Sequence, residues 1–314
     1  MQVVASLSEL QIEQETACVA IGAFDGVHLG HQALLGAMAA RARAAGRAAI
    51  AVTFEPHPAV FFRGLQESFY LSTQADKARR IAALGLDALV VQAFNAAFAA
   101  TSAASYVDAL LTQTRMRELT CGADFALGHN REGNVDYLRR AGERLGFGVH
   151  VAEPVVVEGA IVSSTRVRQA LRAGAVSEAT RLLGRPFELS GVVVAGKQRG
   201  RTIGIPTANI TVADEIAAPA VGVYAALAAL EDGTRLHAVV NIGFRPTFNG
   251  AEPRPTCEAH LLAYSGDLYG QVVRLSFVER LRGEHKFAGV DALVAQIRAD
   301  IGAATAILAA QAGG

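Results

Sequence analysis

The first half of the chain alternates short apolar runs with stretches whose apolar residues recur at helical spacing. We expect buried strands over residues 18–22, 48–54 and 88–91, over a run that ends near Cys121, and over residues 148–154. We expect helices over residues 32–45, 73–84, 101–116, 164–173 and 177–183. In the first of these helices Leu34, Leu35 and Met38 share one face. This alternation predicts an α/β domain in which helices cover both faces of a parallel sheet.

The pattern changes near Gly184, where strand-like runs separated by turn signals replace the alternation. The expected strands are residues 188–195, 223–230, 236–242, 256–263 and 272–279, and a final helix is expected over residues 290–310. We therefore expect an antiparallel β-barrel with a C-terminal helix. The predicted domains are residues 1–184 and residues 185–314.

Composition narrows the class of protein without indicating its chemistry. The chain has 314 residues, which suits two domains, and 51% of them are hydrophobic, which argues against disorder. The 29 basic and 29 acidic residues give no net charge, so a general nucleic-acid binder is not expected. The composition leaves room for a local basic pocket that binds a small anion.

Cysteine usage and the hydropathy pattern favour a cytoplasmic protein. Cys18, Cys121 and Cys257 have no C-x-x-C spacing, so neither a disulfide framework nor a cysteine-based zinc site is expected. The N-terminal residues lack the pattern of a signal peptide. The longest uncharged apolar stretch, residues 216–230, contains Pro219 and is too short to span a bilayer, so no membrane association is expected.

A candidate phosphate site lies between the first expected strand and the first expected helix, in the segment FDGVHLGH. Free N–H groups and the positive end of the helix dipole suit phosphate at such a position. His28 and His31 can donate hydrogen bonds to a phosphate, and the glycines allow close backbone approach. A zinc half-site and simple turn residues are the alternatives. The expected phosphate-binding residues of this segment are Gly22, Phe24, Asp25, Gly30 and the two histidines.

The H-x-G-H pattern after the first strand resembles the nucleotidyltransferase superfamily, whose members transfer an adenylyl group from ATP. The segment VSSTRVR provides hydroxyls and an arginine suited to a triphosphate, although for this segment taken by itself a serine or threonine helix cap is the favoured explanation. The expected triphosphate-binding residues are Ser163, Ser164, Thr165 and Arg166. Together with TFEPHP and DFALGHNREG, these motifs resemble the Rossmann-like adenylyltransferase half of bacterial FAD synthetases. The resemblance implies flavin contacts near Pro58 and Asp124.

A second candidate site lies in the segment GKQRGRTIGIPTANI. A glycine-rich basic loop can surround phosphates, and we expect Gly196, Lys197, Gly200 and Arg201 to bind them. The Thr207 hydroxyl and the Asn209 amide oxygen are hard ligands suited to Mg²⁺, although a turn before a strand is the alternative. The Walker spacing is absent.

The second half of the chain closely resembles riboflavin kinases, whose motifs LLGRPFELSG, PTAN, NIGFRPTF, CEAHLL, GDLYG and RLRGEHKF occur in order. The resemblance implies that Thr207 and Asn209 bind Mg²⁺–ATP and that Glu258 is the base on the ribityl hydroxyl. It also implies that Tyr269 and Arg282 lie near the flavin. Taken alone, Glu258 is an ordinary surface carboxylate.

The whole chain is thus similar to the bifunctional riboflavin kinase/FAD synthetase family, and two features depart from the family pattern. Ala126-Leu127 replaces a more usual Arg-Phe, and Cys257 and Ala259 flank Glu258 where larger aliphatic residues are commoner. The resemblance implies ATP, riboflavin, FMN and FAD as substrates and products, Mg²⁺ with ATP, and no permanently bound cofactor. The alternatives are a nucleotidyltransferase for a pantetheine or nicotinate derivative with an accessory barrel, and an inactive flavin sensor. The sequence carries no signal for an oligomeric state.

Overall fold

The computed structural model describes residues 1–65, 68–196, 200, 204–245 and 254–312. The chain forms two compact units. The first unit is Met1–Gln66 with Thr73–Ser164, and the second is Glu67–Ser72 with Thr165–Gly314.

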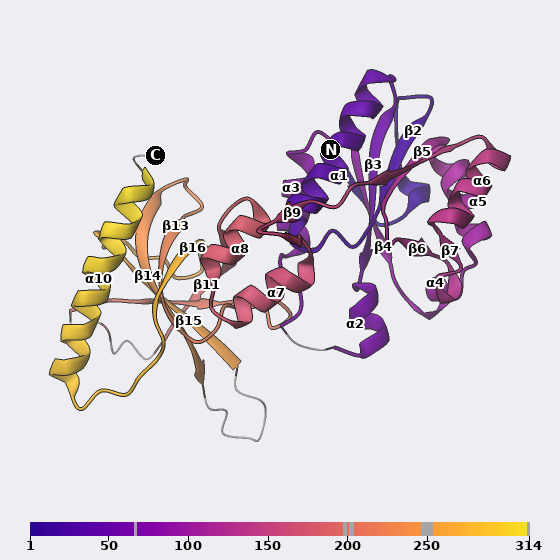
Figure 1. The fold of residues 1–314 in the computed structure, drawn as a ribbon. Coiled ribbons are helices and arrows are strands. Elements are labelled where there is room, and N and C mark those ends of the chain that lie inside the picture. Colours follow the sequence, from indigo (N-terminus) through magenta and orange to yellow (C-terminus); the bar gives the residue numbers. More distant parts are fainter. Residues whose placement is uncertain (66–67, 197–199, 201–203, 246–253, 313–314) are drawn as a thin grey trace. The chain divides into compact units, whose positions relative to one another are not determined.

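A six-stranded parallel sheet forms the centre of the first unit (Figure 1). Its strand order is β1 (Gln2–Val4), β4 (Ala88–Ala93), β3 (Ala48–Glu55), β2 (Ala17–Ile21), β5 (Met116–Gly122) and β8 (Gly148–Ala152). Every residue of β2 is buried, as is typical of a parallel strand that is covered on both faces. The predicted α/β architecture is confirmed.

Alternate residues of the central strands pack against helices on opposite faces of this sheet. Cys18 and Ala20 belong to the cluster that contains Leu35 and Met38 of α1 (Leu29–Ala44) and a residue of α3 (Gln74–Ala82). Val19 and its strand neighbours pack against α5 (Ala103–Thr114) and α6 (Val135–Leu145). The helical face predicted for α1 is therefore confirmed.

Smaller elements occupy the connections of the first unit. The helical segments are η1 (Leu7–Glu9), η2 (Asp25–Val27), α2 (Pro58–Arg63), α4 (Ala96–Ala99) and η3 (His129–Arg131). Two short hairpins pair β6 (Ala126–Leu127) with β7 (Gly133–Asn134), and β9 (Val156–Val157) with β10 (Ala160–Ile161).

The second unit begins with two helices and continues as a closed antiparallel barrel. The helices are α7 (Ser164–Arg172), whose first residue ends the first unit, and α8 (Val176–Leu183). The barrel order is β11 (Phe187–Val194), β12 (Ala208–Thr211), β15 (Arg254–Leu261), β14 (Arg235–Arg245), β13 (Gly222–Ala229) and β16 (Val272–Arg282). The predicted barrel with a C-terminal helix is confirmed.

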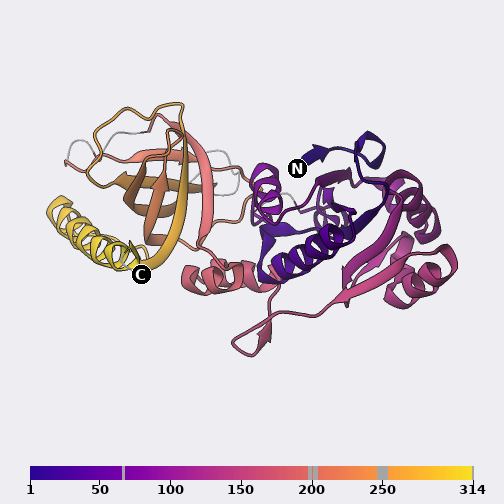
Figure 2. The same ribbon diagram turned by 90° about the horizontal axis from the view of Figure 1, so that it is seen from above.

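The C-terminal helix α10 (Val290–Ala312) lies along the barrel wall (Figure 2). Its Ala304 and Leu308 are buried against Val223 and Val239 of the barrel. In the described part of the chain, one helix, Val290–Gln311, is long and apolar enough to span a bilayer by length and composition. Part of its apolar surface packs on the barrel through these residues.

The structure differs from the expectations in extent and in grouping. Strands β1 and β12 and helix α6 were not expected, and α1 begins three residues earlier than predicted. Helices α7 and α8 group with the barrel rather than with the sheet, because α8 packs on β11 and β16. The compact units thus divide after Ser164, whereas the functional boundary predicted near Gly184 stays a prediction.

Candidate functional site

The loop after β2 adopts an unusual backbone conformation. Phe24 has φ 47° and Val27 has φ 42°, both in the left-handed region that non-glycine residues rarely adopt. Such conformations persist only where surrounding contacts hold them, and they concentrate at functional sites. The contacts here converge on the carbonyl oxygen of Ala23, which accepts from Thr53 Oγ1 at 2.8 Å and from Lys77 Nζ at 3.1 Å.

This loop places the two histidines at the beginning of α1. His28 is the N-cap residue, and its Nδ1 accepts from the backbone N–H of His31 at 3.4 Å. The two imidazole rings stack with centroids 3.6 Å apart, and Phe24 meets His31 edge-on at 5.3 Å. The structure therefore brings both predicted imidazoles together at one helix N-terminus.

His31 is held in its neutral form. Burial lowers its pKa well below the ordinary value, and the nearby His28, Lys77 and His57 lower it further. A neutral imidazole at pH 7 can donate one hydrogen bond and accept another. Its Nδ1 is a buried atom with no hydrogen-bond partner, so the ring retains hydrogen-bonding capacity for a ligand.

The segment that precedes α7 is tied to the same loop. Ser164 Oγ donates to the backbone oxygen of Asp25 at 3.0 Å, and Asp25 is completely buried. A Cβ on Gly30 would lie 3.1 Å from the His28 ring, so a side chain there would press on that ring. Ser163 is the half-buried neighbour of Ser164. The Ser164 hydrogen bond therefore connects the second predicted motif to the loop that carries Asp25.

Thr165 and Arg166 follow Ser164 directly but open the second unit. The Arg166 guanidinium forms an ion pair with Glu178, with 3.4 Å between Nε and Oε1. Their predicted role in triphosphate binding stays a prediction.

A cluster of aromatic side chains lies beside Pro58, and sequence reasoning missed it. Neighbouring rings are 5.2–5.7 Å apart between centroids, and the Phe62 side chain is 68% exposed. Its members are Phe54, Phe61, Phe62, Phe94 and Phe98. They come from β3, α2, α4 and the end of β4. Because they are far apart in the sequence, no local motif predicts that they form a cluster. Exposed ring faces of this kind suit a planar ligand.

The unusual Ala126-Leu127 pair lies in the β6–β7 hairpin. Leu127 is buried and packs in the core of the sheet, so this departure from the family pattern acts in packing. Asp124, predicted to contact a flavin, is exposed, and its backbone oxygen accepts from Arg131 at 2.8 Å.

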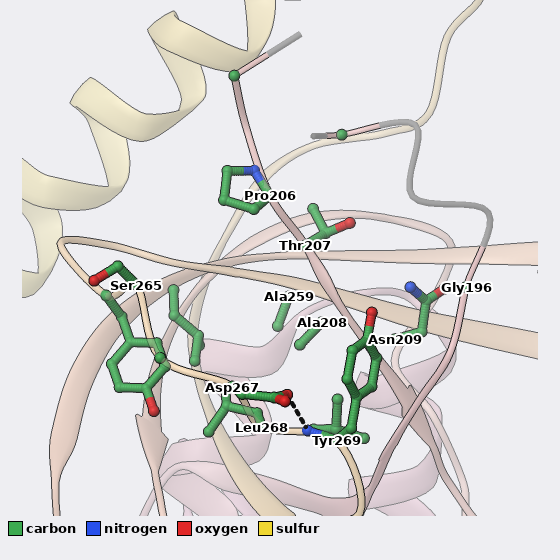
Figure 3. A pocket seen from close by; sticks show the side chains of 16 residues that line it. Gly196, Pro206, Thr207, Ala208, Asn209, Ala259, Ser265, Asp267, Leu268 and Tyr269 are labelled. Atoms are coloured by element: carbon green, nitrogen blue, oxygen red, sulfur yellow. Dashed lines mark hydrogen bonds between the residues drawn. The ribbon is translucent and has the colours of Figure 1, made fainter. Parts of the chain in front are cut away.

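The barrel carries a pocket of about 430 Å³, within the range typical of small-ligand sites. Thr207 and Asn209, the two residues predicted to bind Mg²⁺, line it, and Figure 3 shows Ser265 across the pocket from Gly196. The complete lining is Val193, Gly196, Gly200, Gly204, Pro206, Thr207, Ala208, Asn209, Ala259, Leu261, Tyr264, Ser265, Gly266, Asp267, Leu268 and Tyr269. Sequence reasoning missed the contribution of the 264–268 loop, where Asp267 Oδ1 accepts from the Tyr269 N–H at 3.0 Å.

Two glycines shape this pocket. A Cβ on Gly196 would collide with the Asn209 amide, and a Cβ on Gly200 would collide with the Ile205 carbonyl oxygen. The predicted phosphate contacts Lys197 and Arg201 lie outside the described residues. The described residues therefore give a reason for glycine at positions 196 and 200, whereas the role of the two basic side chains stays a prediction.

Strand register places Glu258 directly opposite Asn209 of β12 and Asn241 of β14. Side chains of directly paired residues leave the same face of a sheet, so Glu258 and Asn209 are neighbours. Glu258 is not among the residues that line the pocket. Its side chain leaves the barrel sheet on the same face as the side chain of Asn209.

The two residues that the resemblance associates with flavin are in different surroundings. Tyr269 is 45% exposed and lines the same pocket as Thr207. The Arg282 guanidinium is engaged by Asp300 of α10, with Nε 3.1 Å from both carboxylate oxygens and Nη2 2.8 Å from Oδ2. Arg282 thus forms an ion pair that joins the barrel to α10. Its contact with a flavin stays a prediction.

The oxygen donors of Thr207 and Asn209 suit Mg²⁺, which keeps water and substrate phosphates in its shell. Both residues line one pocket that is large enough for a nucleotide phosphate chain. Over the described ranges, no group of three or more His, Cys, Asp or Glu side chains is placed to hold a metal ion.

In the comparison with known proteins, two different family models match the two halves of the chain. The model of the FAD synthetase family matches residues 10–166, and that of the riboflavin kinase family matches residues 183–308. Each match contains one of the two sites described above.

Similarity to individual proteins extends over nearly the whole chain. The bifunctional riboflavin kinase/FMN adenylyltransferase of Pseudomonas fluorescens is 39% identical over 98% of both chains. The enzyme of the same name from Bacillus subtilis is 34% identical over 92% of this chain and 91% of its own length. A crystal structure described as a macrolide-efflux protein from Streptococcus pneumoniae has 28% identity and a TM-score of 0.87, covering 96% of this chain and 98% of its own. With both domain models in order and full-length relatives above 30% identity, the chain belongs to the bifunctional riboflavin kinase/FMN adenylyltransferase family.

Proposed function

We propose that the chain makes FAD from riboflavin in two ATP-dependent steps, one in each unit. The barrel transfers the γ-phosphoryl group of ATP to riboflavin, which yields FMN and ADP. The sheet-containing unit then joins FMN to the adenylyl group of a second ATP and releases pyrophosphate. The observation that carries this proposal is the presence of two separate phosphate-type sites, each inside the segment that matches the corresponding family.

In the adenylyl transfer, a phosphate oxygen of FMN attacks the α-phosphorus of ATP. A new P–O bond forms as the bond to the pyrophosphate oxygen breaks, and negative charge moves onto pyrophosphate. His28 and His31 stand at a helix N-terminus, where they donate hydrogen bonds to the phosphates as this charge develops. Positioning and charge neutralisation supply most of the rate enhancement in such reactions.

The other residues of the two predicted motifs are proposed to hold the nucleotide. The triphosphate can approach closely the backbone around Gly22, Phe24, Asp25 and Gly30. The Ser163 hydroxyl is proposed to donate a hydrogen bond to it. Ser164, Thr165 and Arg166 extend this set. The Ser164 hydrogen bond to Asp25 supports the proposal, because it links the two motifs within one unit.

The aromatic cluster gives the flavin ring of FMN a binding surface. The exposed Phe62 of α2 and Pro58, the first residue of the same helix, offer apolar faces, and stacking on such faces is favourable for planar rings. Asp124 is proposed to contact the flavin from the segment after β5.

In the phosphoryl transfer, Glu258 accepts the proton of the ribityl terminal hydroxyl as its oxygen bonds to the γ-phosphorus. The bond to the β-phosphate oxygen breaks and leaves ADP. Glu258 and Asn209 are paired across β15 and β12, which supports a meeting of hydroxyl and phosphate at this point. A divalent ion held by Thr207 and Asn209 would neutralise charge on the phosphates.

The pocket beside Thr207 takes the nucleotide. Gly196 and Gly200 let the backbone approach its phosphates, and Lys197 and Arg201 are proposed to add positive charge. Tyr269 and Arg282 are proposed to contact riboflavin. We infer Mg²⁺ as the ion and the cytoplasm as the compartment, the latter because all three cysteines are buried and unpaired.

Incubation of the full chain with riboflavin and Mg²⁺–ATP, followed by chromatographic separation of flavins, tests the proposal. We expect both FMN and FAD. The double variant His28→Ala/His31→Ala should form FMN but no FAD, and removal of one such donor commonly costs about 10²–10³-fold in rate. Glu258→Gln should form no FMN from riboflavin yet make FAD when FMN is supplied. Normal FAD formation by the histidine variant would refute the assignment of the first site.

A further inference from the structure

Lys77 of α3 is a buried lysine that no motif in the chain singles out. Its side chain is 1% exposed, whereas lysine is almost never fully buried unless it is paired. Its Nζ donates to the Ala23 carbonyl oxygen at 3.1 Å and lies 3.5 Å from Thr53 Oγ1. Burial of an ammonium group costs several kcal/mol, so these contacts must offset that cost.

The contacts of Lys77 lead directly to the loop of the first site. Ala23 precedes Phe24, the first of the residues with left-handed backbone, and its carbonyl oxygen accepts from Lys77 and Thr53 together. Burial lowers the pKa of Lys77, and the nearby carboxylates of Asp25 and Glu55 oppose this shift by favouring the charged ammonium. Lys77 therefore holds the backbone of the loop that leads into α1, and it adds a positive charge beside that loop.

Lys77 also acts on the histidine pair through space. The charged and titratable groups that face His31 are His28 at the start of α1, Lys77 of α3 and His57 before α2. The carboxylates of Asp25 and Glu55 are the nearby acidic groups that act on Lys77. An ammonium group that is already oriented needs no reorganisation when negative charge arrives with the phosphates.

We propose that Lys77 is a positioning residue for adenylyl transfer, which fixes the loop through the Ala23 carbonyl oxygen and places a positive charge near the His28–His31 pair. This inference rests on the proposed function of the first unit. It assigns to α3, an element outside both motifs, a specific role in holding the imidazoles for the phosphates.

The test compares Lys77→Met with Lys77→Arg in the full chain, and Arg79→Met is the matched control. Arg79 is a cation on the same helix whose guanidinium lies in a surface ion pair with Asp76, 3.0 Å from its carboxylate. Rates of FAD formation from FMN and of FMN formation from riboflavin are measured over a range of pH. The His31 resonance is titrated by NMR and assigned through its absence in His31→Gln.

We expect Lys77→Met to slow FAD formation by about 10²-fold, the usual effect of a misplacement near 1 Å. The pKa of His31 should rise, because one of the groups that lower it is gone, and the acid limb of the pH–rate profile should move to higher pH. Lys77→Arg should keep the low pKa and recover part of the rate. Arg79→Met and all rates of FMN formation should stay within about 2-fold of the parent.

Three results would overturn the inference. They are a Lys77→Met rate within about 3-fold of the parent, a slow variant in which the His31 titration is unchanged, and a full recovery of rate in Asp25→Asn/Lys77→Met. The last variant removes both buried charges, so it separates positioning from the cost of an unpaired carboxylate. If the parent chain itself makes no FAD, the proposed function fails, whereas a parent that makes FAD as fast as Lys77→Met refutes only the role of Lys77.

Discussion

Replacement of Asp300 by alanine should destabilise the barrel unit and leave the first unit unchanged. The Asp300 side chain is 5% exposed and binds the Arg282 guanidinium through three contacts of 2.8–3.1 Å. It also accepts from Gln296 at 2.9 Å. Asp300→Ala therefore leaves a partly buried guanidinium without its carboxylate.

The magnitude follows from how much water the remaining guanidinium can reach. Loss of one partner of a buried ion pair costs about 3–5 kcal/mol. We expect about 3 kcal/mol here, at the lower end, because the Arg282 side chain is 19% exposed and its Nη1 also donates to the Gly283 oxygen. For a unit of this size that corresponds to a decrease in Tm of roughly 6–12 °C.

The assay must separate the two units, since a chain with two compact units need not unfold in one transition. The chain contains no tryptophan, so calorimetry is combined with residual FMN and FAD formation after heating. The double variant Arg282→Met/Asp300→Leu is the control. It replaces the pair with apolar side chains and should lose much less stability than the two single variants together.

A decrease in Tm below about 2 °C for Asp300→Ala would refute the reasoning. Equal loss in the double variant and in the sum of the single variants would also refute it, because the two side chains would then not be coupled. A stable double variant with a raised KM for riboflavin would support a separate flavin contact of Arg282.

Three further predictions concern the two sites. Gly196→Ala should slow FMN formation by about 10²-fold, because the new Cβ displaces the Asn209 amide, and a normal rate would contradict that role. Phe62→Ala should raise the KM for FMN by up to about 10-fold through lost stacking, and an unchanged KM would place the flavin elsewhere. Burial lowers the pKa of His31 below its ordinary value of 6.5, so the unfolded chain binds a proton that the native unit does not. The first unit should therefore lose stability as pH falls below about 6.5, and denaturant unfolding should show a smaller loss in His31→Gln; equal pH dependence in both proteins would contradict this account.

The local pattern of apolar residues was sufficient to predict the helices and strands that bury one regular face. The expected helix that contains Leu35 and Met38 exists as α1, and the apolar run after residue 47 is β3. Helix α6 escaped notice because its sequence is strongly charged and buries little beyond Leu138 and its neighbours. Strand β12 escaped notice because it has four residues and follows a proline, which reads as a turn.

The sequence by itself determined the change of period near Gly184 and the two motifs that carry the histidines and the PTAN segment. These depend on neighbours in the chain, where propensity and spacing act directly. Only the tertiary structure decided that Glu258 is paired with Asn209, that five phenylalanines meet in one cluster, and that Lys77 is buried against the loop before the histidines. Strand register and core packing join residues far apart in sequence, and their energies arise from contacts that no local pattern contains.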